Sequence, residues 1–210
     1  MIQILIADDH EMFREGIKRI CEDNPDLVVA GEASNGNEVL EKVAAREYDL
    51  LLLDIAMPGL NGLDTLKQLK TLKPKLRVLV LSMYPEDEYA VRAIKAGAAG
   101  YLTKAKASRE LMEAIKKISD GGNYIDASVA EKMLFVMKSD SSKPLHRTLS
   151  DREYQILTMI VSGKKVGEIA EELSLSVKTV STYKVRILNK MEMRSTAELV
   201  KYAVENKIIL

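Results

Sequence analysis

The 210-residue sequence predicts a doubly wound α/β domain, with a five-stranded parallel sheet of order 2-1-3-4-5, followed by a small all-α domain. Over the first 120 residues, short apolar segments alternate with segments whose apolar residues have helical spacing. The strand segments are almost entirely apolar, which indicates burial on both faces, as in a parallel sheet. After residue 145 only helical spacing remains, so the second domain is expected to contain no sheet.

Five strand–helix units are expected in the first domain. The strands are predicted at residues 2–7, 27–29, 50–53, 78–81 and 100–103. The helices are predicted at residues 11–23, 36–46, 63–74, 86–96 and 108–120. Further helices are predicted at residues 127–137, 150–162, 167–173, 177–191 and 195–205. A polar segment from Ser139 to Pro144 is the expected linker, and the predicted domains are 1–121 and 146–210, joined by 122–145.

The charge composition excludes several classes of protein. The chain has 31 basic and 31 acidic residues, which argues against a histone-like protein and against an acidic disordered tail. The single cysteine cannot form an internal disulfide or a cysteine-rich metal site. No apolar run approaches the ~20 residues needed to span a bilayer, and no signal peptide is recognised. We therefore expect a cytoplasmic protein with no membrane partner.

Three carboxylates follow strands of the predicted sheet. Asp8 and Asp9 follow the first strand, and Asp54 follows the third. Ligands of doubly wound sheets bind beyond the carboxyl ends of the strands, where the strand order reverses. Clustered carboxylates repel one another, and oxygen ligands of this kind suit Mg²⁺. Ser82 and Lys104 end the fourth and fifth strands, so the set predicts an acyl-phosphate site with an aspartate nucleophile.

Simpler interpretations exist for the individual residues of this region. Any one of the acids alone could be a helix cap or a turn former. His10 is interpreted as an N-terminal helix residue without chemistry, and Cys21 as a core residue because it shares an apolar stripe with Ile17. The acids, the hydroxyl and the lysine together, in this strand order, favour the phosphoryl site.

The motifs of residues 1–120 resemble the receiver domain of bacterial response regulators. The matching residues are Asp8-Asp9-His10, Asp54-Ile-Ala-Met-Pro58, Ser82, Gly97 to Leu102 and Lys104. The resemblance implies that Asp54 accepts phosphate from a sensor histidine kinase. It also implies that Asp8, Asp9, Asp54 and the carbonyl of Ala56 hold Mg²⁺. Ser82 and Tyr101 would then form the conformational switch.

The C-terminal region carries a net charge of +3, from 11 basic and 8 acidic residues at 146–210, whereas residues 1–121 carry 17 and 20. Residues 167–191 predict two helices joined by a tight turn, with Ser176 as the N-cap of the second. Its inward stripe is expected to be Val177, Val180, Ile187, Leu188 and Met191. The residues suited to phosphates and base edges are Lys178, Thr179, Ser181, Thr182, Tyr183, Lys184 and Arg186. This pattern is typical of a helix-turn-helix that enters the major groove of double-stranded DNA.

Residues 148–207 resemble the helix-turn-helix domain of LuxR-type regulators, so the whole chain resembles a NarL/FixJ-type response regulator. The matching segments include Glu168 to Leu173, Ser176 to Val180 and Ser195 to Leu199. Ser181 and Val185 depart from residues frequent in that family, so no base preference is carried over, and Tyr183 and Lys184 are expected to supply contacts. The resemblance implies a homodimer when phosphorylated, with RNA polymerase as a further partner. The interface is expected on the last helix, at Val200, Ala203 and Val204.

Two other functions are compatible with parts of the pattern. The first is an aspartyl-phosphate phosphohydrolase, but such enzymes need a second acid two residues after the nucleophile, where this chain has Ala56. The second is a degenerate receiver that only dimerises, against which the complete set of acids and Lys104 argues. The sequence therefore predicts a phosphorylation-controlled transcription regulator whose only catalysis is phosphotransfer to Asp54 and its reversal.

Overall fold

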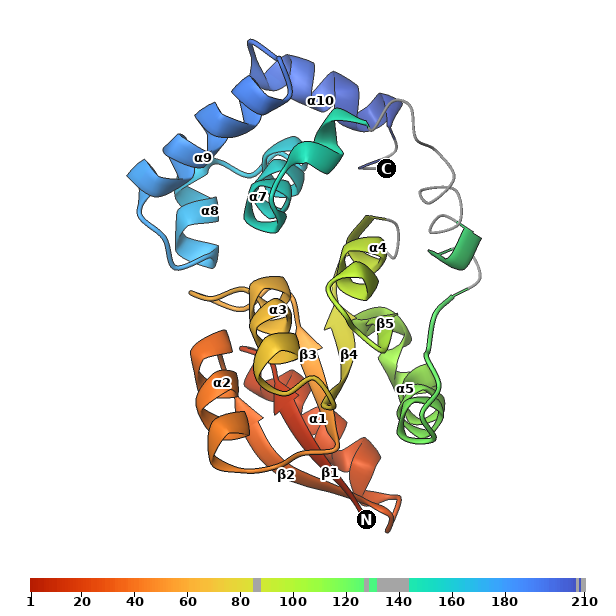
Figure 1. The fold of residues 1–210 in the computed structure, drawn as a ribbon. Helices are drawn as coiled ribbons and strands as arrows, with labels where there is room; N and C mark the ends of the chain where they lie inside the picture. Colours follow the sequence, from red (N-terminus) through yellow and green to blue (C-terminus); the bar gives the residue numbers. More distant parts are fainter. Residues whose placement is uncertain (85–87, 127–128, 132–143, 207, 209–210) are drawn as a thin grey trace. The chain divides into compact units, whose positions relative to one another are not determined.

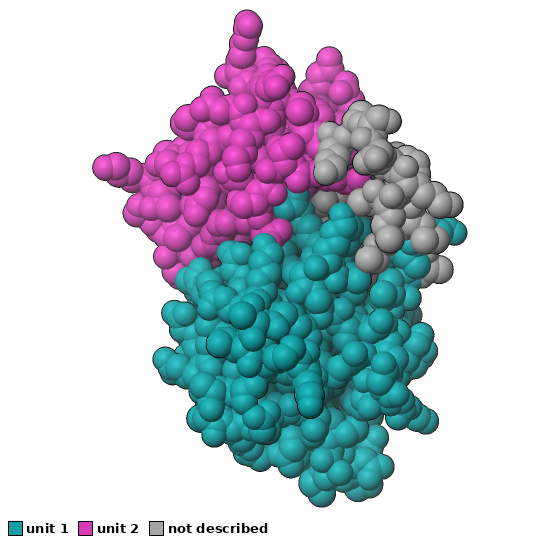
Figure 2. All heavy atoms as spheres, viewed as in Figure 1, with its two compact units in different colours: residues 1–136 teal, residues 137–210 magenta. Residues whose placement is uncertain are grey.

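The computed structural model describes residues 1–84, 88–126, 129–131, 144–206 and 208. The chain divides into two compact units, residues 1–136 and residues 137–210 (Figure 2). Within the described parts of the chain, none of the helices combines the length and the apolar character needed to cross a bilayer.

The first unit is built on a five-stranded parallel sheet. Its strands are β1 (Ile2–Ala7), β2 (Leu27–Ala33), β3 (Leu50–Asp54), β4 (Arg77–Ser82) and β5 (Gly100–Thr103). They pair in the order β2-β1-β3-β4-β5 (Figure 1). This order confirms the predicted fold class, and it places β1 and β3 side by side at the centre of the sheet.

Five helices cover the two faces of this sheet. They are α1 (Glu11–Glu22), α2 (Gly36–Ala45), α3 (Gly62–Leu72), α4 (Glu88–Lys95) and α5 (Lys104–Ser119). One face packs on α1 and α5, in a core that includes Ile4, Leu52 and Leu111. Because successive side chains of a strand alternate between faces, Leu5, Leu51 and Leu53 point to the opposite face, where α2 contacts α3 and α3 contacts α4.

Two elements of the first unit extend four residues beyond a predicted end. Strand β2 continues to Ala33, although Ala30 to Ala33 contain no β-branched residue, because its backbone pairs with β1 through a register shift between Ile4 and Leu5. Helix α5 begins at Lys104 instead of residue 108, so the lysine is the first residue of the helix. The predicted helix 127–137 and the linker lie largely outside the described residues.

The described residues of the second unit form a short 3₁₀ helix, η1 (Leu145–Thr148), and four α-helices. These are α7 (Asp151–Val161), α8 (Val166–Glu172), α9 (Val177–Lys190) and α10 (Thr196–Glu205). Helix α9 contacts α7 and α8, and α10 contacts α7. The core contains Ile169, Ala170, Leu173, Val180, Ile187, Met191, Leu199 and Ala203. Helices α8 and α9 form the predicted helix-turn-helix.

Serine side chains cap three helices of this unit. Ser150 and Glu153 form a capping box at α7, and Ser195 accepts from the Glu198 amide at α10. Ser176 accepts from the Thr179 amide at 3.0 Å, which confirms its predicted role as the N-cap of α9. The turn before α9 contains Ser174 with a φ of 52°, a left-handed conformation that glycine adopts more readily.

Two predictions about the second unit are wrong, namely Val177 on the buried stripe and Ala203 in the dimer contact. Val177 is 57% exposed, because it is the first residue of α9 and the buried stripe starts one turn later, at Val180. Ala203 is fully buried in the core of the unit and is not available for the predicted dimer contact, whereas Val204 is 59% exposed. Leu188 is only half-buried.

Two glycines provide a matched test of the first unit. A Cβ on Gly62 would lie 2.0 Å from the Asp54 carbonyl oxygen, whereas a Cβ on Gly16 would meet nothing within 4 Å. We expect Gly62→Ala to destabilise the unit by about 3 kcal/mol or more through this clash. Gly16→Ala, in the middle of α1, should stabilise it by about 0.5–1 kcal/mol. Denaturant unfolding followed by circular dichroism measures both variants. Equal effects on stability would contradict the close approach of residue 62 to the Asp54 carbonyl oxygen.

The capping box of α7 gives a prediction about pH. Burial alone would raise the pKa of the Glu153 carboxyl, but hydrogen bonds from Lys190 and from the Ser150 amide outweigh burial and lower it. A lowered carboxyl pKa stabilises the folded state above the ordinary glutamate pKa of about 4.3, and the stabilisation disappears as the pH falls through the lowered pKa. Glu153→Gln should therefore cost about 1–2 kcal/mol at pH 7 and much less near pH 3, in unfolding curves recorded at both pH values.

Candidate functional site

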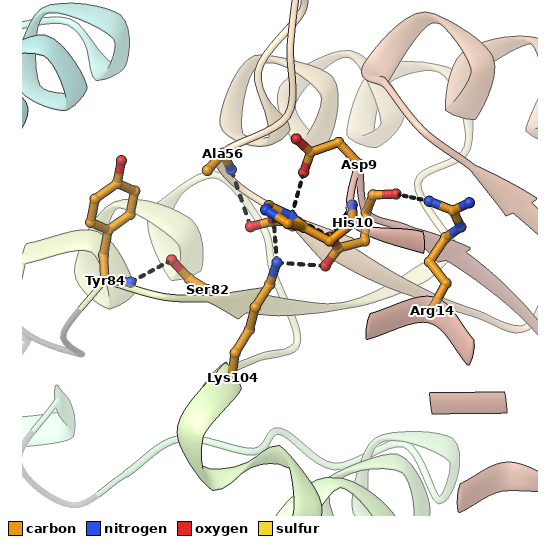
Figure 3. Close-up of polar contacts among 9 residues, drawn as sticks. Asp9, His10, Arg14, Ala56, Ser82, Tyr84 and Lys104 are labelled. Carbon is orange, nitrogen blue, oxygen red and sulfur yellow. Dashed lines mark hydrogen bonds and ion pairs between the residues drawn. The ribbon is translucent and has the colours of Figure 1, made fainter. Parts of the chain in front are cut away.

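The amine of Lys104 lies between two buried carboxylates at the carboxyl ends of β1 and β3. Lys104 Nζ is 2.6 Å from Asp8 Oδ2 and 2.7 Å from Asp54 Oδ2 (Figure 3). All three side chains are nearly inaccessible, with 6% exposure for Lys104, 2% for Asp8 and 1% for Asp54. The structure thus brings together three predicted site residues that are far apart in the sequence.

Burial controls the electrostatics of this pocket. Burial raises the pKa of the Asp54 carboxyl, and the charge of Asp8 adds to this effect, while Lys104 opposes it. Burial alone would lower the pKa of Lys104, but its charge interactions and hydrogen bonds with Asp54 and Asp8 outweigh burial and raise it. The lysine is therefore a permanent cation that offsets one of two adjacent negative charges.

The main chain at the end of β3 orients Asp54. The amide of Ala56 donates to Asp54 Oδ1 at 3.1 Å, so one carboxylate oxygen is held by the main chain and the other by Lys104. The following turn is closed by Gly62, whose amide donates to the Ile55 carbonyl at 3.0 Å. The residue predicted to contribute a carbonyl, Ala56, contacts Asp54 through its amide in this structure.

Asp9 and His10 complete an acidic cluster beside the lysine. Ligand atoms of Asp8, Asp9, His10 and Asp54 all lie within 4.8 Å of one another. Asp8 Oδ2 is buried, and its charge partner is the amine of Lys104. Asp9 is exposed, so the cluster opens to solvent on one side. Carboxylate oxygens at a solvent-facing rim fit the preferences of a hydrated divalent cation.

Several residues that support the cluster were not found from the sequence. Arg14 of α1 donates to the Asp8 carbonyl oxygen at 2.7 Å and to Glu32 of β2 at 3.0 Å. The Phe13 ring lies below the Lys104 amine, 4.7 Å from the ring centre. Phe13 and Arg14 follow His10 by three and four residues, so helical spacing from the acidic motif was the signal that could have found them.

The two predicted switch residues are linked through Tyr84. Ser82 Oγ accepts from the Tyr84 amide at 3.1 Å, and the Tyr101 hydroxyl donates to the Tyr84 carbonyl oxygen at 2.9 Å. Both Ser82 and Tyr101 are buried. The main chain of Tyr84 therefore connects Ser82, at the end of β4, to the side chain of Tyr101 in β5. A shift of the Ser82 hydroxyl would disturb the hydrogen bond that holds Tyr101.

The predicted DNA-reading residues all lie on α9, but they do not share one face, because Lys184 follows the buried Val180 by four residues and lies beside the buried stripe. Lys178, Ser181, Thr182 and Arg186 are exposed, and the other three residues of the set, Thr179, Tyr183 and Lys184, are half-buried. A surface hollow of about 290 Å³ is lined by Lys178, Thr179, Thr182, Tyr183 and Arg186. The face that carries this hollow joins positive charge with short polar side chains.

Hydrogen bonds already occupy two of the hydroxyls on this face. Thr182 Oγ1 donates to the Lys178 carbonyl oxygen at 2.9 Å, and Thr179 Oγ1 lies 2.8 Å from Ser176 Oγ. The guanidinium of Arg186 lies over the Tyr183 ring, 5.8 Å from its centre. These contacts thus hold several side chains of α9 in place before any partner is bound.

The two units match two protein-family models. Residues 4–116 match the response regulator receiver domain, and residues 147–203 match the bacterial regulatory proteins of the luxR family. The chain therefore belongs to the response regulators, with a receiver domain followed by a LuxR-type DNA-binding domain.

Two response regulators match this chain over almost their whole length. The response regulator UvrY of Escherichia coli K12 is 36% identical over 207 residues, covering 98% of this chain and 95% of the relative. The response regulator GacA of Pseudomonas protegens is 38% identical over 209 residues, covering 100% and 98%.

Solved structures show related folds. The RcsB response regulator of Salmonella typhimurium has a TM-score of 0.69 at 24% identity, covering 100% of this chain and 98% of that one. A LuxR-family two-component response regulator from Aurantimonas has a TM-score of 0.60 at 27% identity, covering 66% and 99%. A structure of the response regulator RcsB in complex with DNA has a TM-score of 0.60 at 26% identity, covering 97% and 98%.

Proposed function

We propose that Asp54 accepts a phosphoryl group from a sensor histidine kinase, and that this phosphorylation controls DNA binding by the second unit. The observation that carries the proposal is the pair of contacts from Lys104 Nζ to Asp8 and Asp54, at 2.6 and 2.7 Å. A buried carboxylate beside a fixed cation is the arrangement that an aspartyl phosphate requires. Membership of the response regulators supports the same conclusion.

The chemistry assigns a role to each residue of the pocket. A carboxylate oxygen of Asp54 forms a bond to phosphorus while the bond from phosphorus to the donor nitrogen of the kinase histidine breaks. Lys104 stabilises the negative charge on the phosphoryl oxygens. Asp8, Asp9, Asp54 and the Ala56 carbonyl would hold Mg²⁺, which supplies further charge neutralisation when bound. Hydrolysis of the same acyl phosphate by water would reset Asp54.

Phosphorylation can bias the first unit through Ser82. The phosphoryl group adds negative charge and three acceptor oxygens, one of which the Ser82 hydroxyl would approach. Because the Tyr84 peptide contacts both Ser82 and Tyr101, this movement would release or reposition the Tyr101 ring. One or two charge-assisted hydrogen bonds supply about 2–4 kcal/mol, which shifts a two-state equilibrium by about 30-fold to several hundredfold.

The second unit would then place α9 in the major groove of double-stranded DNA. The exposed face of α9 and the DNA complex of the related RcsB support this step. A further solved structure contains two RcsB dimers bound to DNA, at 25% identity and a TM-score of 0.58, which supports a homodimer of this chain. Val204 remains a candidate for the dimer contact, since it is exposed on α10. We place the protein in the cytoplasm, with RNA polymerase as its partner at the promoter.

We expect Asp54→Ala to abolish Mg²⁺-dependent labelling by a small phosphodonor such as acetyl phosphate, because the substitution removes the nucleophilic oxygen. The measurement is the mass or radioactivity retained by the full chain. Asp120→Ala, which removes an exposed aspartate at the end of α5, is the control and should label like the natural chain. Undiminished labelling of Asp54→Ala would place the phosphoryl group on another residue.

We expect Lys184→Ala to weaken DNA binding on all sequences and to reduce the slope of log K against log salt by about one unit, because one phosphate contact is lost. Lys201→Ala removes the same charge from an exposed position on α10 and should leave the slope unchanged. Fluorescence anisotropy with a labelled duplex at several salt concentrations measures both variants. A slope that stays the same in Lys184→Ala would remove this residue from the phosphate-contacting face.

A further inference from the structure

His10 does not do what its position at a helix start predicts. It is the N-cap residue of α1, where a side chain commonly accepts a hydrogen bond from an amide of the first turn, yet its side chain makes no cap. The imidazole lies instead against the acidic cluster (Figure 3). Its Nδ1 is 2.9 Å from Asp9 Oδ1 and 3.2 Å from Asp8 Oδ1.

These separations suit a shared cation as well as they suit a shared proton. Ligand atoms bound about 2.1 Å from an octahedral ion lie about 3.0 Å apart on neighbouring corners. The two separations at His10 bracket that value, and the whole ligand set, with Asp54 included, lies within 4.8 Å. The imidazole is 65% exposed, so no packing prevents the small movements that coordination requires.

We propose that His10 is an additional metal ligand, and that it enables the acidic site to bind first-row transition metals such as Ni²⁺ or Zn²⁺ in preference to Mg²⁺. The inference rests on the proposed divalent-cation site of Asp8, Asp9 and Asp54 and adds a nitrogen ligand to it. Mg²⁺ gains little from imidazole, since it prefers oxygen and retains its waters. Nickel and zinc bind imidazole strongly, and their affinities for mixed nitrogen and oxygen sites exceed those of earlier divalent ions.

The consequence is a receiver site whose occupancy depends on which metals are present. A transition metal held by His10 and the two N-terminal acids would compete with Mg²⁺ at the site that Asp54 phosphorylation needs. The exposed side of the cluster, formed by Asp9 and His10, provides the route of entry. The metal would then change the rate at which Asp54 is phosphorylated.

The test compares the binding of Mg²⁺ and of Ni²⁺ to the full chain by calorimetry, using the natural chain, His10→Gln and Glu11→Gln. We expect His10→Gln to weaken Ni²⁺ binding by at least about tenfold and to change Mg²⁺ binding by less than about threefold. Glu11→Gln is the matched control, because it changes the exposed neighbouring residue, which lies outside the cluster, and it should leave Ni²⁺ binding unchanged.

Nuclear magnetic resonance locates the ion independently. The chain has two histidines, and His146 belongs to the second unit, where its Nδ1 lies 2.9 Å from the Tyr202 hydroxyl. Paramagnetic Ni²⁺ should broaden the imidazole signals of His10 and leave those of His146 sharp. Equal weakening of Mg²⁺ and Ni²⁺ in His10→Gln, or unchanged Ni²⁺ binding, would overturn the ligand role while leaving the acidic site intact. A natural chain that binds neither ion would overturn the acidic site itself.

Discussion

The ion pairs of Lys104 with Asp8 and Asp54 are the constraint on which the rest of the first unit depends. Two carboxylates within reach of one amine leave a net negative charge in a place that solvent barely reaches. That residual charge makes the pocket receptive to a divalent cation. Burial and the charge of Asp8 raise the pKa of Asp54, whereas the two carboxylates raise the pKa of Lys104. A phosphoryl group on Asp54 would add negative charge beside Lys104 and Asp8, and would thus change the charge balance of the pocket.

The surrounding fold connects the pocket to other parts of the first unit. Parallel pairing of β1 with β3 and of β4 with β5 brings the functional carboxyl ends to one edge of the sheet. The Tyr84 peptide connects Ser82 with Tyr101, and the Tyr101 amide in turn donates to the Tyr124 carbonyl at 3.3 Å. A series of hydrogen bonds, two of which join a side-chain hydroxyl to the main chain, therefore leads from the pocket, across β5, to the segment that follows α5. The two hydrogen bonds at Tyr84 are partly buried.

In the second unit, local hydrogen bonds position side chains of α9. Its positive face is held in place by the helix itself, since Thr182 bonds to the main chain and the Thr179 hydroxyl lies beside that of the Ser176 cap. Both threonine hydroxyls are thus engaged locally, while Lys178 and Ser181 remain exposed. The positive charge of Lys178 is therefore available for contact with an anionic partner. The left-handed Ser174 shows that the turn before α9 tolerates a residue less suited to it than glycine.

The sequence alone determined the fold class, the strand order, the helix-turn-helix and the acids, hydroxyl and lysine at the strand ends, because apolar periodicity and strand-end placement are local properties of the chain. It did not determine the full length of β2, whose residues Ala30 to Ala33 become a strand only by pairing with β1. It also misjudged Val177 and Ala203, since burial at a helix end depends on what the neighbouring helices cover. Only the tertiary structure placed Phe13 under the Lys104 amine and Arg14 beside Glu32, because these partners lie far apart in the sequence and meet only when the strands and helices pack.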